Sequence, residues 1–270
     1  MSKKINIKPC KNNIGAFIDI DINLADKFQI NKIKEAVNNY GVIFFRKQNL
    51  NSECYIKFAK NFGKFFNYPM LKGLKNYPNI TVVEKLPGET VAFGEGFHTD
   101  STYVYNPPTY TMLYSIKTPK KGRGNTQFAS QYLSYKELPQ KYKNEIENLK
   151  AVFSADGPIS KTRNNRTAEK GTGVDPKSLS AEHKIVKVNN INNKKSIFLS
   201  PGHVTKIVGY DEKESMELLT YLYKHQIKSN FVYNFEWEPN CLAIWANGCI
   251  LHNPINDYDE HRVMHRITVQ

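Results

Sequence analysis

Short segments in which residues alternate between two environments set the strongest limit on how this chain can fold. Aromatic side chains occupy every second position of residues 230–239, NFVYNFEWEP, from Phe231 to Trp237, as on a half-buried strand. Residues 241–246 (CLAIWA) and 262–269 (RVMHRITV) also predict strands. Short strands separated by Pro, Gly and Asn indicate a mainly β fold, an all-β barrel or jelly roll with helical additions.

Helices are expected around these strands. Apolar residues recur at helical spacing in residues 31–41 and 51–63, and each range ends at a glycine that can terminate the helix. A third helix is predicted over residues 139–150, with a proline near its first turn. A fourth begins near Asp211, whose spacing to Glu214 is typical of a capping box.

The composition favours one domain in a reducing compartment. A chain of 270 residues, 40% of them hydrophobic, can bury one large core, and we expect a single domain over residues 1–270. No apolar run of about 18 residues occurs, and the amino terminus, MSKKINIKPCKNN, lacks the apolar stretch of a secretion signal. The four cysteines form no CxxC pair, which argues against a zinc knuckle or a disulfide framework. The sequence therefore predicts a cytoplasmic protein without a membrane partner.

The formal net charge of +13 raises the question of nucleic-acid binding. Lysines are spread among Asn and Ile residues along the whole chain, and no arginine-rich cluster with interleaved aromatic residues occurs. A general compositional bias explains this distribution better than a nucleic-acid site does. We therefore expect no nucleic-acid partner, although the positive field would favour small anionic substrates.

Residues 155–184 form a long polar stretch with few apolar residues and many glycines and prolines. A segment of this kind is usually either a lid over a functional site or a disordered loop. We expect a lid-like insertion within the single domain, and its composition leaves open whether the insertion is ordered.

Three residues are candidate metal ligands. His98 and Asp100, in the stretch GFHTDSTY, lie two positions apart and would share one face of a strand. The pair is weak evidence by itself, but His252 follows a predicted strand and adds a third candidate. Two imidazoles and one carboxylate form the facial triad that holds Fe(II) and leaves neighbouring coordination positions open. The alternative, histidines that are merely hydrogen-bonded within the fold, stays open at this point.

Two arginines near the carboxyl terminus point to an anion site. On a strand, Arg262, Met264 and Arg266 would share one face. If that face is buried, both guanidinium groups need anionic partners, because they stay charged and are costly to bury alone. If the strand lies at a sheet edge, the arginines would face solvent instead.

The stretch FGEGFHTDSTYVYNPPTYTMLYSIKTPKKGRGNTQF, followed far downstream by HNPINDYDEHRVMHR, resembles the taurine dioxygenase family of Fe(II)- and 2-oxoglutarate-dependent oxygenases. The resemblance extends from YGVIFFRKQNL, near the amino terminus, almost to the carboxyl terminus. It implies a double-stranded β-helix, the jelly roll or cupin-like barrel, around the metal site.

The same resemblance implies roles for single residues. The two histidines and the aspartate named above would ligate the catalytic iron. Thr126, in GNTQF, and Arg262 would bind the far carboxylate of 2-oxoglutarate, and Arg266 would face the anionic group of the substrate. Three protein ligands would leave room for 2-oxoglutarate and O2 on the metal.

The activity that the resemblance implies is hydroxylation of a small organic anion, coupled to decarboxylation of 2-oxoglutarate to succinate and CO2. The substrate would be a sulfonate, a sulfate ester or a carboxylate, and the enzyme could form a homo-oligomer. Two alternatives are an oxygenase that acts on nucleic acid or protein, and a cupin-like barrel that binds metal without turnover. Retention of the ligands, the threonine and both arginines argues against the non-catalytic barrel.

Departures from the family pattern lie near the expected substrate. Ala246 stands where the family has Asp, so the support of the metal ligands is expected to differ. Gly94, in FGEG, replaces a polar stretch that taurine dioxygenase uses for its substrate, and taurine itself is therefore not expected. We expect His203 and the remaining histidines to be structural, and the aromatic residues of 230–239, like Trp245, to belong to the core.

Overall fold

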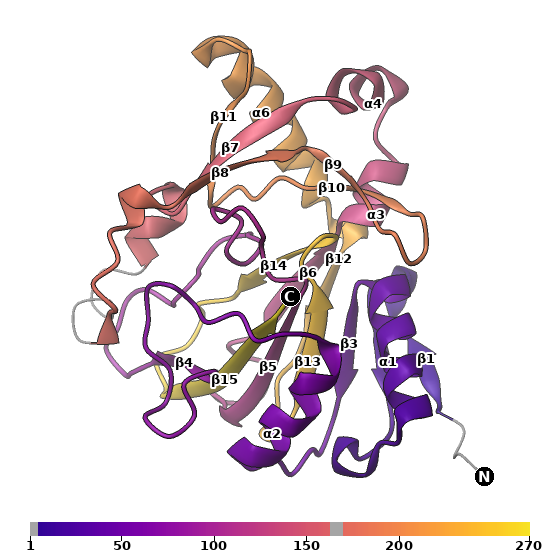
Figure 1. Ribbon diagram of the computed structural model, residues 1–270, viewed down its shortest axis with the longest axis vertical. Coiled ribbons are helices and arrows are strands. Elements are labelled where there is room, and N and C mark those ends of the chain that lie inside the picture. The colour runs from indigo at the N-terminus through magenta and orange to yellow at the C-terminus, as the bar shows by residue number, and fades with distance from the viewer. Residues whose placement is uncertain (1–4, 163–169) are drawn as a thin grey trace.

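The computed structural model describes residues 5–162 and 170–270, and its largest element is a seven-stranded sheet (Figure 1). Across the sheet the strands are β1 (Ile7–Pro9), β2 (Ala16–Ile18), β3 (Val42–Phe45), β13 (Leu242–Ala246), β5 (Tyr110–Lys117), β15 (Arg262–Val269) and β4 (Thr81–Lys85). Neighbouring strands are antiparallel except for β2 and β3, which are parallel. Strand β15, which carries the two arginines, lies between β5 and β4, so it is not an edge strand.

Smaller antiparallel sheets complete the strand arrangement. One has the order β12 (Val232–Phe235), β6 (Thr126–Ser130) and β14 (Ile250–Pro254). A second has the order β11 (Val204–Ile207), β7 (Lys150–Ser154) and β8 (Ser180–Lys184), and a third is the hairpin of β9 (Val186–Val188) and β10 (Lys195–Ile197). The expectation of a mainly β protein with added helices is confirmed for the described residues.

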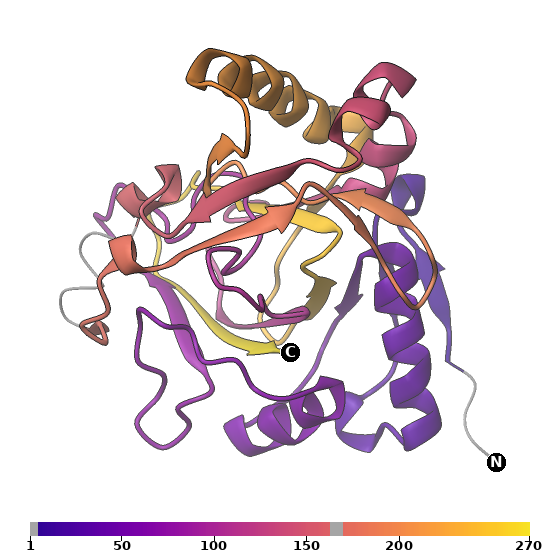
Figure 2. The same ribbon diagram turned by 45° about the horizontal axis from the view of Figure 1, so that its top comes forward.

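Helices cover two opposite ends of this arrangement. They are α1 (Lys27–Tyr40), α2 (Ser52–Ala59), α3 (Gln131–Lys136), α4 (Gln140–Ile146) and α6 (Glu212–Gln226). Short 3-10 turns span Lys11–Asn13, Ile22–Leu24, Lys60–Phe62, Pro158–Thr162, Pro176–Ser178 and Ser229–Phe231. Figure 2 shows α6 and α4 on the side of the molecule opposite α2.

The helix ends are set by their capping residues. Asp211 accepts from the backbone of Glu214 and forms the predicted capping box of α6, which satisfies amide groups that the first turn would leave unpaired. Helix α1 ends at Gly41, where the φ angle of +80° is a conformation that glycine adopts at low cost. Both predicted boundaries are confirmed.

Two predicted elements are longer than the observed ones. The helix expected over residues 139–150 ends at Ile146, because Lys150 already pairs with Lys184 in the sheet of β7 and β8. The strand expected over residues 230–239 is reduced to β12, since only its four residues pair with β6. In both cases long-range strand pairing decides the boundary that local periodicity leaves open.

The main hydrophobic core lies between the seven-stranded sheet and the sheet of β6. Phe44 of β3 stacks on Phe235 of β12 with ring centroids 4.2 Å apart, and its ring also meets Phe128 of β6. Burying one such side chain contributes about 2 kcal/mol. The packing holds the two sheets face to face, and this relation positions the site described below.

A second core lies under α6, where Leu222 belongs to one buried cluster with Phe153 of β7, Ile207 of β11 and the hairpin residue Val186. The insertion predicted over residues 155–184 contributes β8 to this region, and residues 163–169 lie outside the described part of the chain. The described residues of this segment also form two 3-10 turns, Pro158–Thr162 and Pro176–Ser178.

None of the helices among the described residues is both long enough and apolar enough to cross a membrane.

Candidate active site

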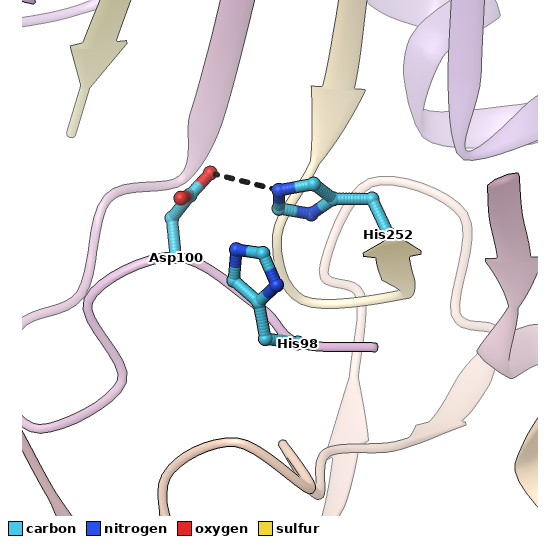
Figure 3. A group of neighbouring side chains, drawn as sticks. All are labelled: His98, Asp100 and His252. Carbon is cyan, nitrogen blue, oxygen red and sulfur yellow. Dashed lines mark ion pairs between the residues drawn. The ribbon is translucent and has the colours of Figure 1, made fainter. Parts of the chain in front are cut away.

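His98, Asp100 and His252 converge on one point (Figure 3). One ligand atom from each side chain can be chosen so that all three lie within 4.8 Å of one another, and all three residues are buried. His252 lies on β14, whereas the His-x-Asp pair lies in the loop between β4 and β5. Such a group of two imidazoles and one carboxylate can hold a divalent metal ion on one side and leave the other side open.

A backbone bridge joins the two histidines across the sequence. The His98 amide donates to the His252 carbonyl over 3.0 Å, and the His252 amide donates back over 2.8 Å. The ring centroids consequently lie 4.1 Å apart. We expected His98 and Asp100 to share a strand face, but this segment forms only that isolated bridge, and a turn with Ser101 at a φ of +50° follows it.

The hydrogen bonding of His98 suits a metal ligand. Its Nδ1 lies 2.8 Å from the carbonyl oxygen of Gly96, which can only accept, so Nδ1 carries the proton and Nε2 presents a lone pair. Gly94 lies against this ring with a φ of +76°, and a β-carbon there would come within 3.3 Å of Nε2. Glycine at this position therefore keeps the space beside the metal-binding nitrogen clear.

Asp100 is held as a carboxylate by two hydrogen-bond donors. Thr111 Oγ1 donates to Oδ2 over 2.7 Å, and Arg266 Nη1 donates to Oδ1 over 3.2 Å. Asn247 Nδ2 in turn donates to Thr111 Oγ1 over 2.9 Å and fixes the hydroxyl. Burial alone would raise the pKa of Asp100, but the interactions with His252, Arg266 and Thr111 outweigh burial and lower the pKa, so the side chain stays ionised.

His252 is held in its neutral form. Burial lowers its pKa to about 3, so the imidazole is available as a metal ligand near neutral pH. The rings of Trp245 and Phe128 pack against it, with centroids 4.7 Å and 6.4 Å away. Trp245 is 1% exposed, as expected for a core residue, but it also lines the cavity beside the metal ligands.

The alternation predicted for the last strand is confirmed by burial from Arg262 to Arg266, beyond which every residue to Val269 is buried. Arg262, Met264 and Arg266 are buried, with exposed fractions of 4%, 0% and 7%, whereas Val263 and His265 are only half-buried. Both arginines line the cavity beside His252. The alternative of two solvent-facing arginines is therefore wrong.

Both guanidinium groups have buried nitrogen donors that lack a hydrogen-bond partner among the described residues. Arg262 makes a side-chain hydrogen bond with Tyr258, and its buried Nε and Nη2 have no partner among the described residues. Arg266 bonds Asp100 through Nη1, packs against the rings of Tyr68 and Phe93, and has a buried Nη2 without a partner in that part of the chain. Buried unpaired donors on two cations are costly, and an anionic ligand would satisfy them.

Thr126 lies at the start of β6 and lines the same cavity as Arg262. Trp237 Nε1 donates to Thr126 Oγ1 over 2.9 Å, so the hydroxyl hydrogen of Thr126 can be donated elsewhere. Trp237 is a core residue, as predicted, and in addition it orients a site residue.

A second hollow also borders His98 and Arg266 and is lined by Tyr68, Phe93, Ile159, Thr162 and His203. Ile159 and Thr162 belong to the predicted insertion. His203 is anchored as a structural histidine would be, with Nδ1 2.8 Å from Thr102 Oγ1, yet its ring also faces this hollow.

Residues that sequence reasoning missed are those that orient the ligands. Thr111, Asn247 and Tyr258 were not among the candidate site residues. Their roles depend on contacts that span from 4 residues, between Tyr258 and Arg262, to 136 residues, between Asn247 and Thr111. Ala246, where the support of the ligands was expected to differ, lines a different cavity, and the hydrogen bonds from Asn247 through Thr111 support Asp100.

Comparison with known proteins places the chain among dioxygenases. It is 28% identical to an alkylsulfatase of Acinetobacter baylyi over 99% of this chain and 86% of the relative. It is 26% identical to an alpha-ketoglutarate-dependent sulfate ester dioxygenase of Pseudomonas putida over 98% of this chain and 89% of the relative. The crystal structure of a taurine dioxygenase from Burkholderia xenovorans superimposes with a TM-score of 0.82 at 26% identity, over 99% of this chain and 89% of that one. The model of the taurine catabolism dioxygenase TauD, TfdA family matches residues 6–268, and the chain belongs to this family.

Proposed function

We propose that this protein, a dioxygenase of that family that uses Fe(II), 2-oxoglutarate and O2, hydroxylates a small organic anion held by Arg266. The observation that carries the proposal is the pair of buried arginines with unpaired donors beside the His98, Asp100 and His252 cluster. One cation suits the cosubstrate, and the second suits a substrate that is also an anion.

In this proposal Arg262 and Thr126 bind the far carboxylate of 2-oxoglutarate. The free Nε and Nη2 of Arg262 form the fork that matches a carboxylate, and the Thr126 hydroxyl can add a third donor. Tyr258 and Trp237 hold these two side chains in place. His98, Asp100 and His252 would hold the iron, which would supply the oxidising chemistry with 2-oxoglutarate and O2.

The substrate would lie on the side of Arg266, with its body in the hollow near His203 and Phe93. Arg266 Nη2 would bind a sulfonate, a sulfate ester or a carboxylate, since each presents oxygen acceptors. Relatives of this chain are named for their substrates, which include sulfate esters, sulfonates and 2,4-dichlorophenoxyacetate. Gly94 contributes no polar side chain, and taurine is not the substrate we propose.

We further propose that residues 1–270 form one domain whose two facing sheets are those of a double-stranded β-helix, or jelly roll. Support comes from the packing of Phe44 against Phe128 and Phe235 across the sheets. Residues 155–184 would act as a lid, because Thr162 Oγ1 accepts from the Gly94 amide over 3.2 Å beside the site.

The proposal is tested by oxygen uptake of the Fe(II)-loaded protein with 2-oxoglutarate. One pool of small sulfonates and sulfate esters is compared with one pool of small carboxylates. Stimulation by either pool supports the proposed reaction and identifies the anion that Arg266 accepts. Absence of any uptake that depends on 2-oxoglutarate would overturn the proposal.

A further inference from the structure

A separate cavity lies on the opposite side of β13 from the metal ligands. Trp245 lines the metal pocket, whereas the next residue, Ala246, lines this cavity, because successive residues of a strand point to opposite faces. The cavity has a volume of about 390 Å³, within the range of small-molecule sites. We name it the hairpin cavity, since Lys187 and Ser196 of the β9 and β10 hairpin form one of its walls.

The hairpin cavity contains a cation without a carboxylate partner. Lys187 Nζ lies 3.4 Å from the centroid of the Phe198 ring, and both residues line the cavity. Within residues 5–162 and 170–270 no Asp or Glu forms an ion pair with Lys187. Burial lowers the pKa of this ammonium to about 8, which reflects the same lack of a compensating charge.

Hydrogen bonds make the polar wall of the cavity rigid. Asn189 Nδ2 donates to Asn38 Oδ1 over 2.9 Å and to the Tyr132 hydroxyl over 2.7 Å. Ser196 Oγ donates to the Gly248 carbonyl over 2.7 Å, which ties the hairpin to the turn after β13. Figure 1 shows the hairpin reaching from α3 toward one end of α1. Because these hydrogen bonds already hold the cavity open, ligand binding requires little free energy for reorganising its side chains.

Apolar groups form another part of the cavity wall. The Tyr132 ring, the buried thiol of Cys249 and the methyl group of Ala246 face the cavity together with Pro107 and Pro108. Burial raises the pKa of the Cys249 thiol, so it is a neutral apolar group here and contributes no negative charge. The cavity thus combines one partly buried cation with an apolar wall.

We propose that the hairpin cavity is a second ligand site, which binds a small organic anion with an aromatic or other apolar body. The anionic group would pair with Lys187, and the body would lie against Tyr132 and Ala246. This site is distinct from the metal pocket, because neither the metal ligands nor the two arginines line it. Asn247 lines the hairpin cavity and also supports Asp100 through Thr111.

The probe for this site is 4-bromobenzoate, with binding measured by calorimetry on the full chain. We expect Lys187→Met and Ala246→Leu each to weaken binding at least about tenfold, because the first removes the cation and the second fills the cavity. Arg266→Gln should leave this binding in place, and the neutral 4-bromobenzyl alcohol should bind more weakly than the acid. Lys187→Met removes an unpaired, half-buried charge, so it is not expected to prevent folding.

The anomalous signal of bromine in crystals soaked with the probe then locates it. A peak in the hairpin cavity that Lys187→Met abolishes supports the proposal. It is overturned if Arg266→Gln abolishes binding while Lys187→Met does not, since the probe would then occupy the metal pocket. Binding at crystal concentration only, with no calorimetric signal at millimolar probe, also overturns it.

Discussion

The metal pocket and the hairpin cavity lie on opposite faces of β13, and each contains cations that lack full pairing. They differ in the kind of cation. The arginines of the metal pocket keep their charge at any physiological pH, so only a bound anion can relieve their burial. Lys187 can relieve its burial by losing a proton, because its pKa is already lowered to about 8. The buried charges of the metal pocket therefore require a bound anion, whereas the hairpin cavity can be neutral without a ligand.

The largest effect is expected from Asp100→Ala, which removes one metal ligand and the partner of Arg266. Turnover, measured as oxygen uptake with 2-oxoglutarate, should fall at least about a thousandfold, equal to about 4 kcal/mol. Asp19→Ala, at an exposed position, is the matched control and should retain wild-type turnover. Full iron-dependent activity of the Asp100 variant would exclude the metal centre that we describe.

A direct contrast between the two cavities comes from removing one cation in each. Arg262→Met should raise the KM for 2-oxoglutarate about 30-fold with a smaller change in kcat, because a charge-assisted hydrogen bond to the carboxylate is lost. Lys187→Met, which removes the cation of the hairpin cavity, should leave this KM unchanged. Equal KM values for 2-oxoglutarate in both variants would show that Arg262 does not hold the cosubstrate.

A smaller effect is expected from Trp237→Phe, which removes the donor to Thr126 and keeps the ring in the core. The KM for 2-oxoglutarate should rise about fivefold, corresponding to one hydrogen bond of about 1 kcal/mol. In a double-mutant cycle with Thr126→Val the two effects should be strongly non-additive, since both substitutions disturb one hydroxyl. Additive effects would mean that Trp237 acts only through core packing.

The smallest effect concerns stability rather than turnover. The folded pKa of Lys187, about 8, lies below the unfolded value of about 10.4, so the unfolded chain binds the proton more tightly. This difference makes the folded protein less stable as the pH falls from about 10.4 through 8. Lys187→Met should therefore stabilise the protein at pH 7 by about 1 kcal/mol, a value discounted for the exposed part of the side chain, and by less at pH 10. Urea unfolding at both pH values measures the difference, and an equal gain at both would contradict it.

Local patterns in the sequence predicted those features that depend on neighbours along the chain. The common face of Arg262 and Arg266 follows from strand alternation, and the capping box at Asp211 follows from a spacing of three residues. The family resemblance rests on the same motifs, and the family comparison confirms it. Where a boundary depends on long-range pairing, as at Ile146, the periodicity predicted a longer element than the one observed.

By itself, the sequence determined the ligand types, the strand that carries the arginines and the mainly β character of the protein. Only the tertiary structure decided that His98 and His252 form a backbone bridge, that Thr111 and Asn247 support Asp100, and that a cavity opens behind Ala246. The physical reason is that periodicity reports the environment of a residue, buried or exposed. The identity of the side chain across a sheet depends on register and packing between segments more than a hundred residues apart.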